Sequence, residues 1–95
     1  MTVSREELAA TIDVAEWGWL RSHLERGGIV LVSRELDLTD IGMAVTRDDT
    51  ATISRLITDG NIGKPTAEQI AAWDDNKGKQ FNMLIVSPYI LAQEL

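Results

Sequence analysis

Two short apolar runs, far apart in the chain, set the strongest limit on the fold. Ile29–Ser33 is a continuous, mostly β-branched run, and Phe81–Val86 is a second strand candidate. The first run is short enough to be a strand buried on both faces. An isolated pair of strands is marginal in water, so the runs must lie side by side under helices. The sequence therefore predicts an α+β domain with a small two- or three-stranded sheet covered by four or five short helices.

Helical patterns fill the chain before the first strand. Ser4 and Glu7 have the spacing of a capping box, which predicts a short helix over Ser4–Ile12. Asp13 is expected to cap a second helix, which ends at Gly27-Gly28 because glycine accepts the left-handed conformation of a helix end. The apolar stripe of that second helix is formed by Val14, Trp17, Leu20 and Leu24.

Two further helical segments are expected between the strand runs. Apolar residues three and four apart predict a helical hairpin over residues 38–59, or one helix with a break near Asp48. A second capping box, formed by Thr66 and Gln69, predicts the start of the last helix. Between them, Gly60–Lys64 is interpreted as a turn, because it lacks the preceding strand that a phosphate-binding loop needs.

The C-terminal segment after Pro88 allows two interpretations. Proline cannot donate to a strand ladder, so Pro88 interrupts the second strand and Tyr89–Ala92 is expected to be extended beyond it. Tyr89 and Gln93 are then expected on or near a sheet edge, where an unpaired strand can bind another chain. The alternative is that the segment closes this protein's own sheet, and we favour it because few strands are available.

Composition and charge exclude several classes of function. The 95 residues are enough for one domain, residues 1–95. The net charge is −6 and the 9 basic residues are scattered, which argues against nucleic acid and anionic membranes as partners. The chain has no cysteine, no apolar stretch near the roughly 18 residues needed to span a bilayer, and no start typical of a signal peptide. We therefore expect a cytoplasmic protein without disulfides or a thiolate metal site.

Candidate catalytic groups are few, and we expect neither an enzyme nor a cofactor. His23 is the only histidine, and a single histidine without cysteine cannot fill a zinc site. As a general base it would need a partner within hydrogen-bond reach, and we interpret it as a partly exposed helix residue. The adjacent acids Asp74-Asp75 are interpreted as solvated surface, because neighbours on a helix point about 100° apart. An oxygen-only site for magnesium or calcium could be formed by four other aspartates, Asp37, Asp40, Asp48 and Asp49. Three of them, Asp37, Asp48 and Asp49, precede helical runs and are better explained as helix caps.

The tryptophans point to a possible interface. Trp17 and Trp73 fall on predicted inward faces and are expected in the core. Trp19 projects about 200° round the helix from Trp17, away from the apolar stripe. Exposed tryptophans are enriched at protein interfaces. The alternative is that the N-terminal helix covers Trp19 with Leu8 and Ile12.

The order of several motifs resembles a known family. The motifs are, in chain order, Trp17, Arg26-Gly27, Ile29–Ser33, Glu35-Leu36-Asp37-Leu38, Ala44, Asp48-Asp49, Trp73 and Pro88–Glu94. They resemble the short bacterial family called domain of unknown function 2288, over nearly the whole chain. The resemblance implies a bacterial cytosolic protein with no established activity, and it assigns no site residue.

Three hypotheses of function follow. The first is a non-catalytic, self-associating protein-interaction domain, because small domains with limited cores often gain stability by association. The second is a small-molecule-binding protein or enzyme in which Asp37, Asp48 or Asp49 converges with Tyr89. A nucleic-acid module is least favoured. The expected binding residues are Trp19, Asp48, Asp49, Tyr89 and Gln93.

Overall fold

The structure, a computed structural model, describes residues 4–26, 28–86 and 89–95. Helices and strands alternate irregularly along these ranges. The elements are α1 (Arg5–Thr11), β1 (Asp13–Glu16), α2 (Trp17–Leu24), β2 (Ile29–Val32), α3 (Leu38–Thr46), α4 (Thr50–Thr58), β3 (Ile62–Gly63), α5 (Ala67–Asp74), β4 (Gln80–Val86) and β5 (Tyr89–Glu94). The predicted α+β class and the predicted helices over residues 38–59 and after Thr66 are confirmed.

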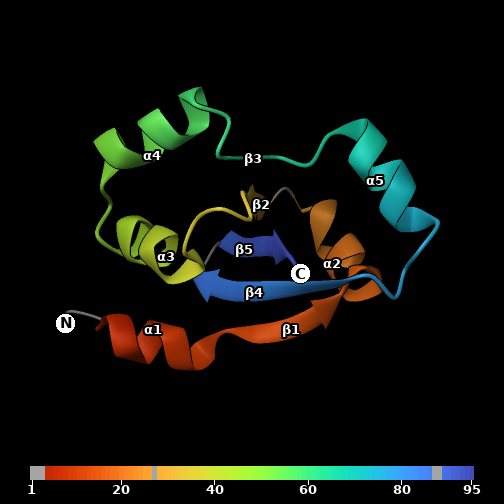
Figure 1. The fold of residues 1–95 in the computed structure, drawn as a ribbon, viewed down its shortest axis with the longest axis horizontal. Coiled ribbons are helices and arrows are strands. Elements are labelled where there is room, and N and C mark those ends of the chain that lie inside the picture. Colours follow the sequence, from red (N-terminus) through yellow and green to blue (C-terminus); the bar gives the residue numbers. More distant parts are fainter. Residues whose placement is uncertain (1–3, 27, 87–88) are drawn as a thin grey trace.

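A single mixed sheet joins the strands in the order β1-β4-β5-β2-β3. β2 and β5 are parallel, and the other neighbouring pairs are antiparallel. The sheet runs through the middle of the molecule, with α1, α3 and α4 gathered near one end of the strands and α2 and α5 near the other (Figure 1). The expected two or three strands are wrong in number, because the structure has five.

β1 is the first strand that the sequence concealed. Asp13–Glu16 was expected to open a helix, but it pairs with β4 from Asp13 opposite Met83 to Glu16 opposite Gln80. Asp13 still caps a backbone donor, although the donor is the N–H of Val14, at 2.8 Å, rather than a helix turn. Pairing with a distant strand satisfies the backbone here and overrides the local helix signal. The helix begins only at Trp17 and ends at Leu24, before the predicted stop at Gly27-Gly28, of which Gly27 lies outside the described residues.

β3 is the second concealed strand. The segment Gly60–Lys64, interpreted as a turn, contains the two-residue strand Ile62–Gly63, which pairs with the end of β2. The N–H of Ser33 extends this pairing by donating to the carbonyl oxygen of Asn61 at 2.8 Å. The strand stops short of Pro65, which has no N–H to contribute to a ladder. Two residues are too few to give a periodic signal in the sequence.

β5 decides between the two interpretations of the C-terminal segment. It lies between β4 and β2, so the segment closes this protein's own sheet, as favoured. The expected position of Tyr89 and Gln93 on or near a sheet edge is therefore wrong. Pro88 lies outside the described residues.

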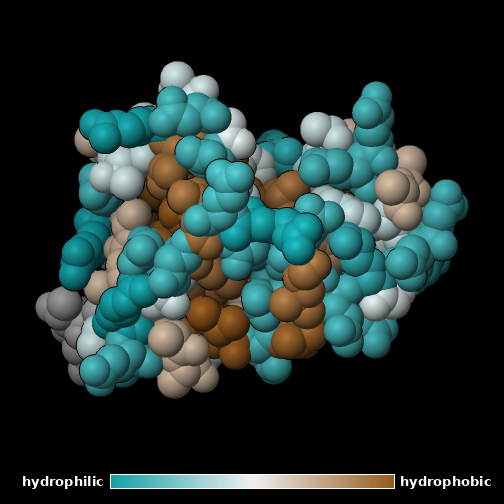
Figure 2. All heavy atoms as spheres, in the orientation of Figure 1, coloured by the Kyte–Doolittle hydropathy of each residue, from teal (hydrophilic) through white to brown (hydrophobic). Residues whose placement is uncertain are grey.

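One face of the sheet carries an aliphatic layer, which we define as α1, α3 and α4 with the side chains beneath them. Its buried residues contain no aromatic ring: they are Leu8, Val32, Leu38, Ile41, Met43, Ile62, Leu84, Val86 and Leu91. Ile12, Ile53 and Leu56 pack against this cluster. Because Leu8 and Ile12 are committed here, the alternative that the N-terminal helix covers Trp19 is wrong. In the orientation of Figure 1, Figure 2 shows hydrophobic residues in the middle of the visible face, with polar residues around them.

The opposite face carries an aromatic layer, which we define as α2 and α5 with the side chains beneath them. Trp17, Trp73 and Phe81 form its centre, and Leu20, Ile29 and Ala92 surround them. The Trp17 and Trp73 ring centroids are 4.9 Å apart, and Phe81 meets Trp73 edge-on at 5.0 Å. The prediction that Trp17 and Trp73 belong to the core is confirmed, since they are 1% and 5% exposed.

Candidate functional site

Asp37 caps its own helix rather than joining a cluster of aspartates. Its Oδ1 accepts the N–H of Thr39 at 2.9 Å, and its Oδ2 lies 2.6 Å from Nη2 of Arg5. The hydrogen bond from Thr39 and then the bond and charge of Arg5 lower the pKa of Asp37. Arg5 also pairs with Asp40. These bonds tie α1 to the start of α3 and give the two aspartates a structural role.

Asp48 and Asp49 form the joint between α3 and α4. Asp49 accepts the N–H of Thr52 at 3.2 Å and its hydroxyl at 2.7 Å, and these bonds lower the pKa of Asp49. Asp48 has a φ of 55°, a left-handed conformation that aspartate tolerates better than most residues. Asp49 lines a hollow of about 280 Å³ together with Arg5 and Arg47. Tyr89 does not line that hollow, so the geometry favours capping over a shared site.

Tyr89 and Gln93 lie at opposite ends of β5. Tyr89 is 44% exposed and opposite Val86. Gln93 is partly buried, and its Nε2 donates to the carbonyl oxygens of Ser33 at 2.8 Å and Leu36 at 2.7 Å. Gln93 therefore fixes the loop that joins β2 to α3. Across the described ranges, no hydrogen bond or salt bridge joins any two of the five residues expected to bind.

Asp74 has a role that the sequence did not show. Its Oδ1 accepts the indole Nε1–H of Trp17 at 2.8 Å and lies 3.2 Å from Nε of Arg21. The interpretation of Asp74 as solvated surface is therefore wrong. The bond satisfies the one polar group of a buried tryptophan and joins α5 to α2. The partners are 57 residues apart, and no local spacing relates them.

The aromatic layer leaves one part of the sheet uncovered. α2 begins beside the start of β4, where the N–H of Trp17 donates to Lys79 O at 2.8 Å, and it leads on to β2. Arg21 lies on the flank of α2 that meets α5. Trp19 precedes Arg21 by two residues, which places it about 200° round the helix from Arg21. It therefore lies on the other flank of α2.

The sheet face that α2 packs against also carries an exposed apolar residue. Ile85 is 50% exposed at the far end of β4, opposite Ile90, and Met83 precedes it on the same sheet face. Trp19 is 42% exposed, and its ring lies 4.2 Å from that of His23. We call Trp19, Met83, Ile85 and Ile90 the apolar corner.

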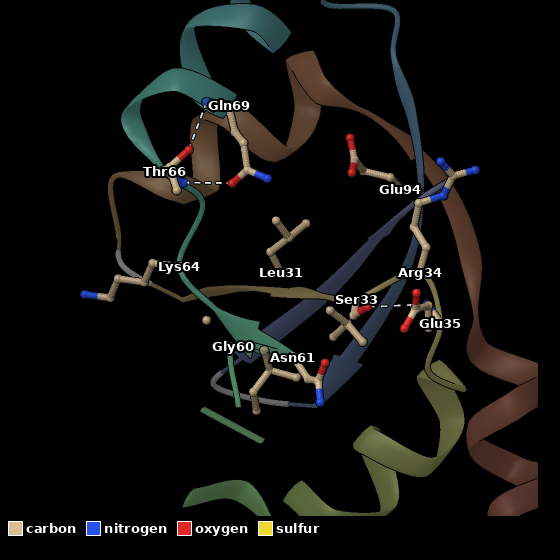
Figure 3. Close-up of a pocket in the computed structure, with 13 residues that line it drawn as sticks. Leu31, Ser33, Arg34, Glu35, Gly60, Asn61, Lys64, Thr66, Gln69 and Glu94 are labelled. Atoms are coloured by element: carbon tan, nitrogen blue, oxygen red, sulfur yellow. Dashed lines mark hydrogen bonds between the residues drawn. The ribbon is translucent and has the colours of Figure 1, made fainter. Parts of the chain in front are cut away.

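A second gap lies between α5 and the β2–β3 end of the sheet. It is a hollow of about 550 Å³, and we call it the β2–β3 hollow. Figure 3 shows Leu31 in its middle, surrounded by polar and charged side chains from four segments. The lining comprises Leu31, Val32, Ser33, Arg34, Glu35, Gly60, Asn61, Ile62, Gly63, Lys64, Thr66, Gln69 and Glu94. Sequence reasoning missed it, because the hollow exists only once β3 is recognised as a strand.

The comparisons with known proteins identify the family. The chain belongs to the family described as protein of unknown function (DUF2288), whose model matches residues 3–94. The resemblance inferred from the motif order is confirmed. A solved structure, the NMR solution structure of PA1075 from Pseudomonas aeruginosa, has the same fold, with a TM-score of 0.79 and 22% sequence identity. The match covers 92% of this chain and 80% of that one. No protein with a curated description matches the chain significantly.

In residues 4–26, 28–86 and 89–95, no helix combines the length and hydrophobicity needed to cross a membrane. The same ranges contain no group of three or more histidine, aspartate or glutamate side chains placed to hold a metal ion.

Proposed function

We propose that this protein is a small, non-catalytic protein-interaction domain that self-associates through the apolar corner. The observation that carries the proposal is the exposure of two large apolar side chains, Trp19 in α2 and Ile85 on the sheet face that α2 packs against. Covering an exposed apolar surface with a second chain is favourable in free energy. Tryptophan contributes strongly to the binding free energy where it becomes buried between two chains.

Charge supports a second copy of the chain as the occupant. Asp13, opposite Met83 in β1, lies on one side of the corner, while His23 and Arg26 lie towards the end of α2 on the other. In a two-fold arrangement each surface meets the same surface of its partner. With the two-fold axis parallel to the strands, the acidic side of one copy faces the basic side of the other. The charges then favour one face-to-face register.

The free edge at β1 is less suited to pairing two copies. Val14 is the exposed middle of that edge, and its N–H is already held by the carboxylate of Asp13 at 2.8 Å. Glu16 adds a second negative charge to the same short strand. Charged residues on short edge strands oppose pairing with a like-charged edge. Self-association is therefore expected through the face of the sheet and not through this edge.

Light scattering on a sizing column, over a wide range of protein concentration, tests the proposal. The wild type is expected to form a dimer that dissociates on dilution. Trp19→Ala and Ile85→Asp are expected to shift the mass to that of a monomer while the far-ultraviolet circular dichroism is unchanged. Ile57→Asp is the matched control, because Ile57 is 57% exposed on α4 in the other layer.

Two outcomes would contradict the proposal. A wild type that is monomeric at every concentration removes self-association. A dimer that Ile57→Asp dissociates and Ile85→Asp leaves intact places the interface on the aliphatic layer instead.

A further inference from the structure

The geometry points to the β2–β3 hollow as a binding site for a small zwitterion of about the size of a dipeptide. Its volume of about 550 Å³ falls within the range of cavities that hold small ligands. Gly63 lies opposite Leu31, and a Cβ at Gly63 would meet no atom within 4 Å. Leu31 thus offers an apolar floor beside open space, which suits the aliphatic part of a ligand. This inference does not depend on the proposed self-association.

The walls of the hollow are held in place by hydrogen bonds of their own. Gln93 fixes the loop that carries Arg34 and Glu35 through its two bonds to that loop's carbonyl oxygens. On the opposite wall, the backbone N–H of Thr66 donates to Oε1 of Gln69 at 2.9 Å, and the N–H of Gln69 donates to the Thr66 hydroxyl at 3.1 Å. A site with walls fixed in this way pays little ordering entropy when a ligand binds. Gln93 is therefore a positioning residue for this site.

The capping box also gives Gln69 a direction. Because Oε1 of Gln69 is engaged by the start of α5, its Nε2 is left to donate, and Figure 3 shows the amide group turned towards Leu31. An amide donor above an apolar floor suits a carbonyl or carboxylate oxygen of a ligand. The neutral part of the lining thus accommodates a peptide-like molecule.

The charged part of the lining has both signs. Arg34 and Lys64 contribute two positive groups, and Glu35 and Glu94 two negative groups. Glu94 is paired with Lys79 at 3.4 Å, whereas Arg34, Lys64 and Glu35 form no salt bridge with any described residue. Figure 3 shows Lys64 on one side of Leu31 and Arg34 and Glu94 on the other, with the ammonium end of Lys64 and the guanidinium of Arg34 turned away from Leu31. A molecule with an ammonium group and a carboxylate can meet both signs, whereas an ion of one sign meets a like charge.

Nuclear magnetic resonance of backbone amides, with the dipeptide alanyl-leucine as the probe, tests this inference. Saturable shifts are expected at Leu31, Gly63 and Gln69, with a dissociation constant on the order of 1 mM, as befits a ligand of this size. The same dipeptide with acetylated and amidated ends, which carries no charge, is expected to bind at least about tenfold more weakly, the loss of one favourable charged contact.

Variants locate the site without disturbing the fold. Gly63→Val is expected to abolish the shifts, because its side chain fills the open space beside Leu31. The fold is expected to tolerate valine here, because a β-branched residue suits a strand. Lys64→Met and Glu94→Gln are each expected to weaken binding several-fold, and Lys77→Met, outside the lining, is the matched control. Unfolding by urea shows whether each variant remains folded.

Three results would overturn the inference. Shifts that rise linearly without saturation would show that no site exists. Equal affinity for the capped and free dipeptides would show that charge plays no part. Tighter binding of succinate or of 1,4-diaminobutane than of the dipeptide would show that the hollow selects an ion of one sign.

Discussion

The two faces of the sheet are covered in different ways. The aliphatic layer uses three helices and side chains such as Leu84 and Leu91, which pack in many similar arrangements. The aromatic layer uses two helices and three rings, whose positions depend on a hydrogen bond from Trp17 to Asp74 across the domain. The aliphatic layer buries Leu84, Val86 and Leu91, whereas the aromatic layer leaves Ile85 exposed and borders the β2–β3 hollow.

This difference separates the parts of the molecule that hold it together from the parts available for binding. A core of aliphatic side chains tolerates exchange of one for another when the volume is kept. Rings packed at fixed angles, with a polar group to satisfy, depend more on geometry. Both candidate binding surfaces border the aromatic layer, so changes in that layer are expected to reach function sooner than changes in the aliphatic layer.

The largest expected effect is on the aromatic cluster. Phe81 is fully buried and contacts both Trp17 and Trp73, so Phe81→Ala is expected to lower the free energy of unfolding by about 3–5 kcal/mol. The near-ultraviolet circular dichroism of the tryptophans is expected to weaken with it. Leu91→Ala, in the aliphatic layer, is the control: it is expected to cost about 2–5 kcal/mol and to preserve that signal.

Denaturation with urea and near-ultraviolet spectra of the native proteins measure both quantities. Phe81→Leu provides a milder change if Phe81→Ala does not fold. Equal loss of the tryptophan signal in Leu91→Ala would show that the two layers do not pack independently, and the comparison between them would fail.

A smaller effect is expected where the aliphatic layer approaches the sheet most closely. A Cβ at Gly42 in α3 would overlap Cδ2 of Leu84, which is fully buried. Overpacking costs about 1–3 kcal/mol, and alanine normally gains about 1 kcal/mol over glycine in a helix. Gly42→Ala is therefore expected to lower the free energy of unfolding by up to about 2 kcal/mol.

Gly18 in α2 is the matched glycine on the other face. A Cβ there would lie 3.7 Å from Lys77 O, an ordinary contact. Gly18→Ala is expected to be neutral or to stabilise by up to about 1 kcal/mol. Urea midpoints compare the two variants, and a stabilised Gly42→Ala would show that α3 can move away from the sheet.

The smallest expected effect is the acid sensitivity of the aliphatic layer. The pKa values of Asp37 and Asp49 are lowered in the folded state below the ordinary 3.8. The unfolded chain therefore binds more protons in acid. The stabilisation is complete above the ordinary pKa and is lost as the pH falls through the lowered values.

The double variant Asp37→Asn, Asp49→Asn tests this, because asparagine keeps a capping oxygen without titrating. Its free energy of unfolding is expected to change less than that of the wild type between about pH 5 and about pH 2. Urea denaturation across this range measures the difference. A wild type and variant with parallel pH profiles would assign the acid sensitivity to other groups.

The features that could be predicted from the sequence depend on interactions between residues close together in the chain. The caps at Ser4, Asp37, Asp49 and Thr66 could be predicted, because each bonds a residue two or three positions away. β2 and β4 were also visible as apolar runs, and the first part of β5 was expected to be extended. β1 was not, because Asp13 and Val14 read locally as the start of a helix and become a strand only beside β4.

The candidate site was less predictable than the fold. Trp19 could be placed outside the core from helical spacing alone, and the structure shows it exposed. Ile85 and Ile90 could not be assigned to the sheet face that α2 packs against, because they come from strands more than 60 residues later whose order had to be known. Gln93 was singled out as a binding residue, but its bonds to Ser33 and Leu36 depend on β5 lying next to β2.

The sequence by itself determined the α+β class, the family, the helix caps and the tryptophans of the core. These depend on local spacing, or on motif order along the chain. Only the tertiary structure decided the number and order of strands, the Asp74 bond, and the two gaps in the aromatic layer. Each of these joins residues far apart in the chain, where backbone pairing and packing outweigh the preferences of any short segment.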